Sequence, residues 1–109
     1  MKNQLRDLMI DSLDKVYQGF YNSIGGNHQR GITLPLFAFV TEKAKMPMSK
    51  GAMQNQHAAN VINVYNVLMD SLYNEARVHA MKKGLKELPL SYIKQQIEDS
   101  KKIITKKLQ

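Results

Sequence analysis

A long run of apolar residues at helical spacing constrains the fold of this chain more than any other feature. Between Ser49 and about Gly84 these residues recur at steps of four and three, which places them on one face of an α-helix. The face consists of Ala58, Ile62, Tyr65, Met69, Leu72, Ala76 and His79, and Val61 and Leu68 widen it. A face of this breadth is typical of a helix that packs against a core. The sequence therefore predicts one long helix here, capped by Ser49.

A second series of residues lies on another side of the same predicted helix. It consists of Asn60, Val64, Val67, Ser71, Asn74 and Val78. Steps of four and three are also those of a seam between paired helices, where an occasional asparagine can fix the register. Two alternatives follow. The seam pairs with a second copy of the chain to form a homodimer, or another helix of the same chain covers it.

The first half of the long helix is rich in amides and free of charge. No charged side chain occurs from Gly51 to Met69, whereas amides such as Asn63 and Asn66 are frequent. The amides exclude a transmembrane segment, because each would be costly to bury in lipid without a partner. An uncharged amide face suits contact with a protein or with the edges of bases, and simple solvation of the amides is the alternative.

Three further helices are predicted around the long one. The first spans residues 3–24 and ends at the glycine pair that follows, and its stripe is Leu5, Met9, Leu13, Val16, Phe20 and Ile24. Thr33 caps the second, which Pro47 stops, and its buried side is Leu36, Phe37, Val40 and Ala44. The last begins near Pro89, and its stripe is Leu90, Ile93, Ile97, Ile104 and Leu108.

These patterns predict an all-α fold, namely a small four-helix bundle organised around one long central helix. Residues 1–109 form a single domain, and no segment has the alternating pattern of a β-strand. The second helix and the long helix are separated by only about four residues, as in helix-turn-helix units. Gly19 interrupts the first helix at a place where another backbone is expected to approach closely.

The charge distribution favours an acidic partner. The net charge is +7, and residues 82–109 contribute eight basic and three acidic side chains. The last helix is therefore either a membrane-surface helix or an ordinary bundle helix with a lysine-rich solvent face, and we favour the second. The absence of cysteine fits a reducing compartment, and the charged residues near Met1 are unlike a secretory signal. We expect a cytoplasmic protein.

The sequence indicates no catalytic, cofactor or metal site. Two of its three histidines, His57 and His79, would lie about 33 Å apart on one continuous helix, too far to share a ligand. Asp7, Asp11 and Asp14 are interpreted as a solvated helix face, with Lys15 placed to pair with Asp11. The loop Gly25–Gly31, which holds His28 and Arg30, is interpreted as a connector rather than a phosphate-binding loop. We therefore expect a protein that is not an enzyme.

Two functional interpretations follow from these observations. In the first, the chain binds DNA as a regulatory or accessory protein: lysines near the tight turn contact phosphates, and amides in the first turns of the long helix contact bases. The residues concerned are Lys43, Lys45, Lys50, Gln54, Asn55 and Gln56. In the second, the chain is an inhibitor, immunity or adaptor protein that contacts an acidic partner protein through the amide face and the second series. The sequence places DNA binding slightly ahead.

Overall fold

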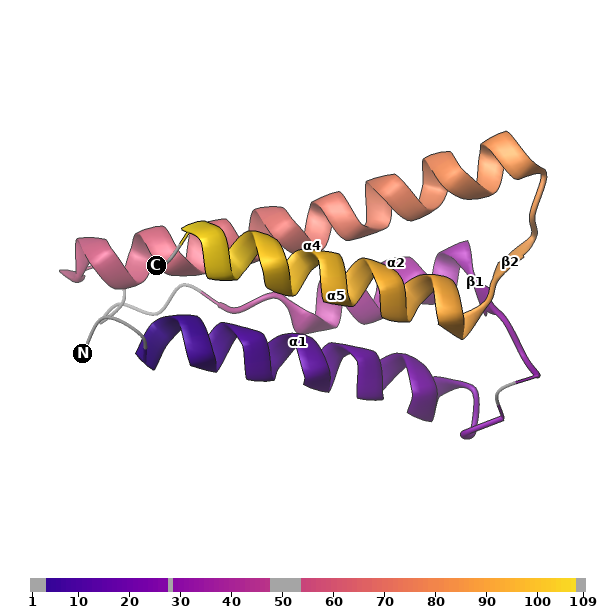
Figure 1. Cartoon of the computed structure of the whole chain (residues 1–109), viewed down its shortest axis with the longest axis horizontal. Helices are drawn as coiled ribbons and strands as arrows, with labels where there is room; N and C mark the ends of the chain where they lie inside the picture. The colour runs from indigo at the N-terminus through magenta and orange to yellow at the C-terminus, as the bar shows by residue number, and fades with distance from the viewer. Residues whose placement is uncertain (1–3, 28, 48–53, 108–109) are drawn as a thin grey trace.

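The chain is mostly helical in the computed structural model, which describes residues 4–27, 29–47 and 54–107. The elements are α1 (Gln4–Ser23), β1 (Ile32–Thr33), α2 (Leu34–Ala44), α4 (Gln56–Lys83), β2 (Glu87–Leu88) and α5 (Leu90–Lys107) (Figure 1). Together they form a compact body of 43 × 27 × 25 Å. The predicted helical class is therefore confirmed.

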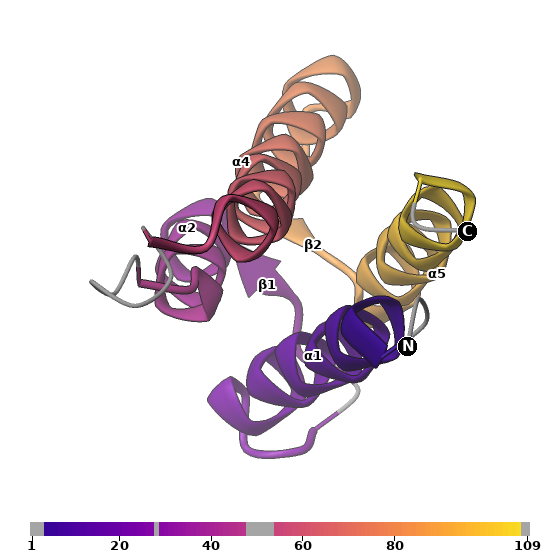
Figure 2. The ribbon, with the colours of Figure 1, turned by 90° about the vertical axis from the view of Figure 1, so that its left-hand side faces the viewer.

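The four long helices that the structure describes associate as two antiparallel pairs. α1 packs most closely with α5, and α2 packs most closely with α4. Seen along the molecule, α1 and α2 are neighbours on one side, and α4 and α5 lie opposite them (Figure 2). α4 is the longest helix, as predicted, but it is one member of a pair and is not surrounded equally by the other three.

The core consists of the apolar stripes that the sequence predicts. The stripe residues of α1 from Met9 to Phe20 are buried, as are Ile93, Ile97 and Ile104 of α5. The buried residues of α4 are Val61, Tyr65, Leu68, Met69, Leu72, Ala76 and Ala80. Phe37 of α2 joins the helices, because its ring lies 4.7 Å from the ring of Phe20 and 6.5 Å from that of Tyr73. Burial of these side chains supplies most of the driving force for folding.

The ends of the helices follow local sequence signals. The Thr33 hydroxyl accepts a hydrogen bond from the Leu36 amide at 3.3 Å and caps α2, as predicted. α4 ends at Gly84 in the left-handed conformation, with φ at 63°. At its start α4 is capped by Asn55, so it begins later than predicted. The predicted cap Ser49 and the centre of the predicted tight turn lie outside the described residues.

A short antiparallel strand pair joins the two chain connections at one end of the molecule, where the sequence predicted no strand. Ile32 pairs with Leu88 and Thr33 pairs with Glu87. Ile32 and Leu88 are both completely buried, so the pair closes this end of the core. Two residues in each strand are too few to show an alternating pattern, which explains why the sequence did not reveal them.

Gly31 allows these two strands to approach one another. A Cβ atom at this position would lie 2.7 Å from Cβ of Glu87, closer than atoms can pack. At Gly19, where the sequence predicted a close backbone approach, an added Cβ would make only an ordinary contact, 3.6 Å from Cγ1 of Val40. The tight approach therefore occurs at Gly31 and not at Gly19.

Replacement of each glycine by alanine tests this assignment. Gly31→Ala should lower the free energy of unfolding by about 1–3 kcal/mol, because β1 must move away from β2 to admit the methyl group. Gly19→Ala should leave stability unchanged or raise it by up to about 1 kcal/mol, because alanine favours the helix and fits the space. Urea denaturation of both variants provides the measurement. Equal stability of the two variants would contradict the assignment.

Candidate functional site

The lysines of the predicted DNA-binding set have different environments. Nζ of Lys45 forms ion pairs with Asp70 at 2.8 Å and with Glu42 at 3.0 Å. Hydrogen bonds to Asp70, and secondarily to Glu42, raise the pKa of Lys45. This ammonium group therefore serves to attach the end of α2 to α4. Lys43 is exposed, with Nζ 5.5 Å from the centre of the Phe39 ring, and Lys50 lies outside the described residues.

The amides of the predicted set are exposed, and two of the three already have local partners. Oδ1 of Asn55 accepts hydrogen bonds from the amides of His57 and Ala58, at 3.1 and 3.3 Å. Nε2 of Gln56 donates to Oδ1 of Asn60 at 2.9 Å. These bonds hold the first turn of α4 in place. Gln54 is exposed immediately before the cap.

Asn66 attaches the segment after α2 to α4 through a pair of hydrogen bonds. Its Oδ1 accepts from the Met46 amide, and its Nδ2 donates to the Met46 carbonyl, both at 2.9 Å. One side chain thus satisfies both backbone groups of a partly buried residue. This amide was interpreted from the sequence as part of a contact face, but it has a structural role.

The second series of residues on α4 is left uncovered along most of its length. Asn60, Val67, Ser71, Asn74 and Val78 are exposed, and Val64 is half-buried. No helix of the described chain covers this face, so the intramolecular alternative of the sequence analysis is wrong for these five positions. Homodimerisation through them stays a prediction.

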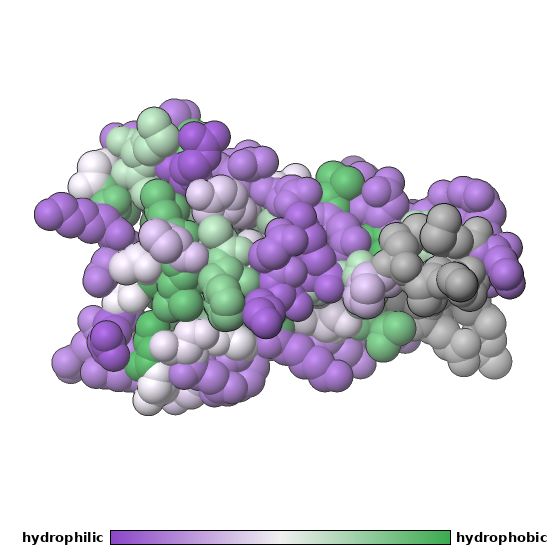
Figure 3. Space-filling model, turned by 180° about the vertical axis from the view of Figure 1, so that it is seen from behind, coloured by the Kyte–Doolittle hydropathy of each residue, from purple (hydrophilic) through white to green (hydrophobic). Residues whose placement is uncertain are grey.

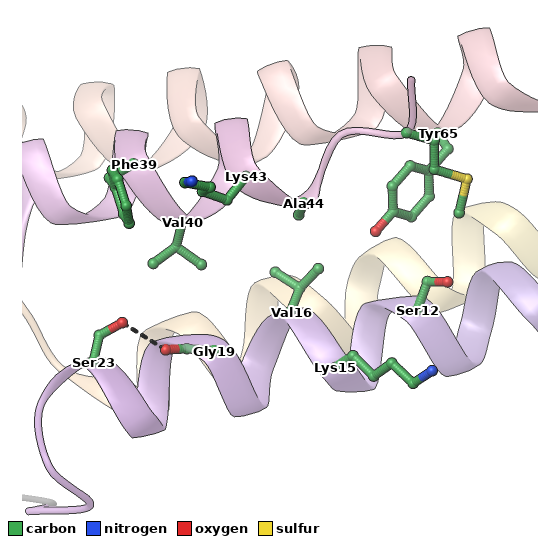
Figure 4. Close-up of a pocket in the computed structure, with 11 residues that line it drawn as sticks. Ser12, Lys15, Val16, Gly19, Ser23, Phe39, Val40, Lys43, Ala44 and Tyr65 are labelled. Atoms are coloured by element: carbon green, nitrogen blue, oxygen red, sulfur yellow. Dashed lines mark hydrogen bonds between the residues drawn. The ribbon is translucent and has the colours of Figure 1, made fainter. Parts of the chain in front are cut away.

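A groove of about 390 Å³ runs between α1 and α2 on the side of the molecule opposite to the view of Figure 1. Val16 and Gly19 of α1 face Val40 and Ala44 of α2 across it, and Tyr65 of α4 lies at one end (Figure 4). Small side chains at facing positions keep the two helices from filling this space. On the same side of the molecule, hydrophobic residues form a band bordered by hydrophilic ones (Figure 3).

The polar groups at the groove are of two kinds, namely serine hydroxyls that already donate hydrogen bonds and lysine ammonium groups without a carboxylate partner among the described residues. Ser12 and Ser23 donate to carbonyl groups of their own helix, at 2.9 and 2.7 Å. Lys15 on the α1 side and Lys43 on the α2 side line the same groove, and neither forms an ion pair with any described carboxylate. The groove therefore combines an apolar floor with a lysine on each side that forms no ion pair with a described carboxylate.

The predicted pairing of Lys15 with Asp11 does not form. Both residues are exposed, but the described ion pairs of α1 involve other carboxylates. Asp14 pairs instead with Lys101 of α5, which also contacts Glu98 at 3.3 Å. The ion pair between Lys101 and Asp14 fixes α1 against α5 and leaves Lys15 available at the groove.

The sequence does not reveal this groove, although it contains one signal for it. Gly19 interrupts an apolar helix face, and Ser12, Ser23 and Ala44 are the other small residues that line the space. Small residues on two helices can mean either close packing or an unfilled gap, and only the relative placement of α1 and α2 distinguishes these outcomes. Phe39, exposed at 58%, was likewise not recognised as a surface residue.

Other kinds of site are not found in the described parts of the chain. His79 is half-buried and stacks on Tyr92 with ring centres 4.2 Å apart. Among residues 4–27, 29–47 and 54–107, no group of three or more histidine or acidic side chains could hold a metal ion. Within the same ranges no helix is both long and apolar enough to span a membrane.

Comparisons with protein-family models, curated proteins and solved structures found no match for this chain. The groove and the exposed face of α4 are therefore the features from which its function is inferred.

The contact between Asn66 and Met46 leads to a stability prediction. Asn66→Ala should lower the free energy of unfolding by about 1–3 kcal/mol, because two partly buried backbone groups lose their partners. Asn63→Ala is the matched control, since Asn63 is an exposed amide on the same helix, and it should change stability by no more than about 0.5 kcal/mol. Chemical denaturation measures both. A loss of stability that is equal in the two variants would show that the paired hydrogen bonds contribute nothing specific.

Proposed function

We propose that this chain is a small intracellular protein-binding module, folded as a four-helix bundle, which holds an acidic amphipathic helix of a partner protein in the groove between α1 and α2. The observation that carries the proposal is the combination of an open apolar groove with an unpaired lysine on each side. This is the protein-binding alternative of the sequence analysis, with its contact surface moved from the amide face of α4 to the groove.

The dimensions of the groove favour a helix as its occupant. From Ser12 to Ser23 the α1 wall is about 17 Å long at 1.5 Å per residue, which corresponds to about three helical turns. A helix that lies in such a groove inserts apolar side chains at steps of three and four and keeps its opposite face in water. A single acyl chain would leave one whole side of its length exposed to solvent. The open groove therefore suits a helix better than a lipid.

The charges at the groove favour acidic residues on the occupant. Lys15 and Lys43 lie on opposite helices, so carboxylates on both flanks of the apolar stripe would each meet an ammonium group. Exposed ion pairs of this kind contribute only about 0.2–1 kcal/mol each. Their main effect is to select acidic partners and to accelerate association, which the net charge of +7 reinforces. The apolar contacts, including Phe39, supply most of the affinity.

The DNA-binding interpretation receives less support from the geometry. Lys45 already has two carboxylate partners, and Asn55 and Gln56 already have hydrogen-bond partners in the chain. Lys45 would have to exchange its carboxylate partners for a phosphate, and a bidentate contact of Asn55 or Gln56 with a base would compete with the hydrogen bond that each side chain already makes. The groove requires no such exchange, because Lys15 and Lys43 have no ion pairs in the described structure to give up.

A synthetic labelled helix, with leucines at steps of three and four and glutamates on both flanks, provides the test by fluorescence anisotropy. Lys15→Glu combined with Lys43→Glu should weaken binding roughly tenfold, since attraction becomes repulsion on both sides. Phe39→Ser should weaken it by a similar factor through lost apolar contact. Lys94→Glu with Lys102→Glu, and Val67→Ser, are the matched controls away from the groove and should bind like the parent protein.

Two outcomes would overturn the proposal. One is equal loss of binding in the groove variants and in their charge-matched controls, which would indicate nonspecific attraction. The other is failure to bind the helix together with binding of labelled duplex DNA that depends on salt and is lost in a triple Lys43→Ala, Lys45→Ala, Lys50→Ala variant. That second result would establish the DNA-binding interpretation instead.

A further inference from the structure

The outward face of α4 is an uncharged surface that the described chain leaves uncovered. Eight exposed residues follow one another along it at helical spacing, namely Gln56, Asn60, Asn63, Val67, Ser71, Asn74, Val78 and Met81. None of them is charged in a chain whose charged fraction is 23%. Val67, Val78 and Met81 are exposed at 54%, 40% and 68%. An uncharged row that combines exposed apolar side chains with amides and a hydroxyl is the part of α4 best suited to contact with another molecule.

Two charged residues flank this row, and their order along the helix bears on how a second helix could pair with it. Asp70 and Arg77 lie on the same side of it, two helical turns apart, with the acidic residue nearer the start of α4. Asp70 uses Oδ1 for its ion pair with Lys45, which leaves its second carboxylate oxygen available. Arg77 makes only a weak contact to Sδ of Met81, at 3.8 Å, and forms no ion pair with a described carboxylate.

We propose that a second copy of the chain covers this face, with the two α4 helices antiparallel about a two-fold axis between residues 72 and 73. In this register Val67 faces the partner's Val78. Ser71 faces the partner's Asn74 at the centre. Because the arrangement is symmetric, each contact occurs twice. Val67 and Val78, both exposed in the single chain, are thereby buried against apolar partners.

The flanking charges fit the same register. Asp70 and the partner's Arg77 lie on the same side of the seam, displaced by only about 3 Å along the helix axis. Their symmetry mates form a second such pair. In a parallel two-fold arrangement the same flank of the two helices would lie on opposite sides of the seam, so Asp70 could not meet the partner's Arg77. The proposed pair of opposite charges therefore fits the antiparallel direction.

A second copy explains this surface better than an unrelated partner does. Val67 and Val78 match one another in size, Ser71 and Asn74 match as hydrogen-bonding groups, and Asp70 and Arg77 match in charge in the one register. An unrelated protein would require none of these internal correspondences. The proposal does not depend on the groove, because Tyr65, which reaches the groove, lies on the opposite side of α4 from Val67.

Cysteine cross-linking tests the register, and the natural absence of cysteine makes the test clean. Val67→Cys and Val78→Cys are made as separate variants, and both positions are exposed, so the fold tolerates them. When the two variants are mixed and oxidised, a disulfide should join one molecule of each. Neither variant should cross-link with itself, because identical positions in the antiparallel pair lie about 17 Å apart.

A charge exchange tests the flanking pair in the full chain by sedimentation equilibrium. Arg77→Asp alone should weaken dimerisation at least roughly tenfold, because two repulsive contacts replace two attractive ones. Asp70→Arg alone should do the same, with circular dichroism confirming that both variants stay folded. The double variant Asp70→Arg, Arg77→Asp should recover the parent's dissociation constant to within about threefold.

The results that would overturn the proposal are equally specific. If the parent protein is monomeric at high concentration, the proposed dimer does not exist. If Val67→Cys cross-links with itself in preference to forming the mixed disulfide, the antiparallel register is wrong. If the double charge variant dimerises no better than either single variant, Asp70 does not pair with the partner's Arg77.

Discussion

The contact of Phe37 with Phe20 and Tyr73 is the interaction on which the rest of this structure depends. Phe37 is the meeting point of α1, α2 and α4, and its ring is almost completely buried. Tilted aromatic pairs of this kind contribute beyond the area that they bury. The contact holds α2 between α1 and α4 near the strand pair. Further along α2, toward Ala44, the side chains that face α1 are smaller than Phe37. The groove therefore stays open between α1 and α2.

The groove is a consequence of how the molecule distributes its side-chain volume. A protein interior tolerates few voids, because unfilled space forfeits dispersion contacts. Gly19 and Ala44 line such a space at the surface, where water can enter it. The unfavourable free energy then comes from apolar side chains that stay in contact with water, such as that of Phe39. A residue such as leucine at position 44 would fill the gap more favourably. The small residues and the exposed aromatic ring at one place therefore support the proposed binding role of the groove.

The sequence predicts the helices and most of the core correctly, because the 3.6-residue period of apolar side chains identifies a buried face wherever a helix packs. It does not predict how these faces meet. Ser49 and Asn55 are both residues that cap helices well, and spacing alone does not show that Asn55 accepts hydrogen bonds from the backbone of α4. Lys15 has an acidic neighbour four residues away, whereas the carboxylate that forms an ion pair on α1 belongs to Asp14, which faces α5. The groove depends on the same relative placement, and so it could not be derived from spacing alone.

The two proposed surfaces are compatible on one framework, and their combination has a functional consequence. The groove is lined mostly by α1 and α2, whereas the exposed row of α4 lies on the side of that helix opposite Tyr65, its one residue at the groove. A dimer formed through α4 therefore keeps both grooves open and presents two of them. A single helix of about three turns in an open groove gives only modest affinity, since its ordering opposes binding. Two linked grooves raise the effective concentration of a second helix once the first is bound, so a partner with two acidic helices would bind far more tightly than either helix alone. Dimerisation would thus convert a weak, general recognition of acidic helices into selection for partners that carry a pair of them.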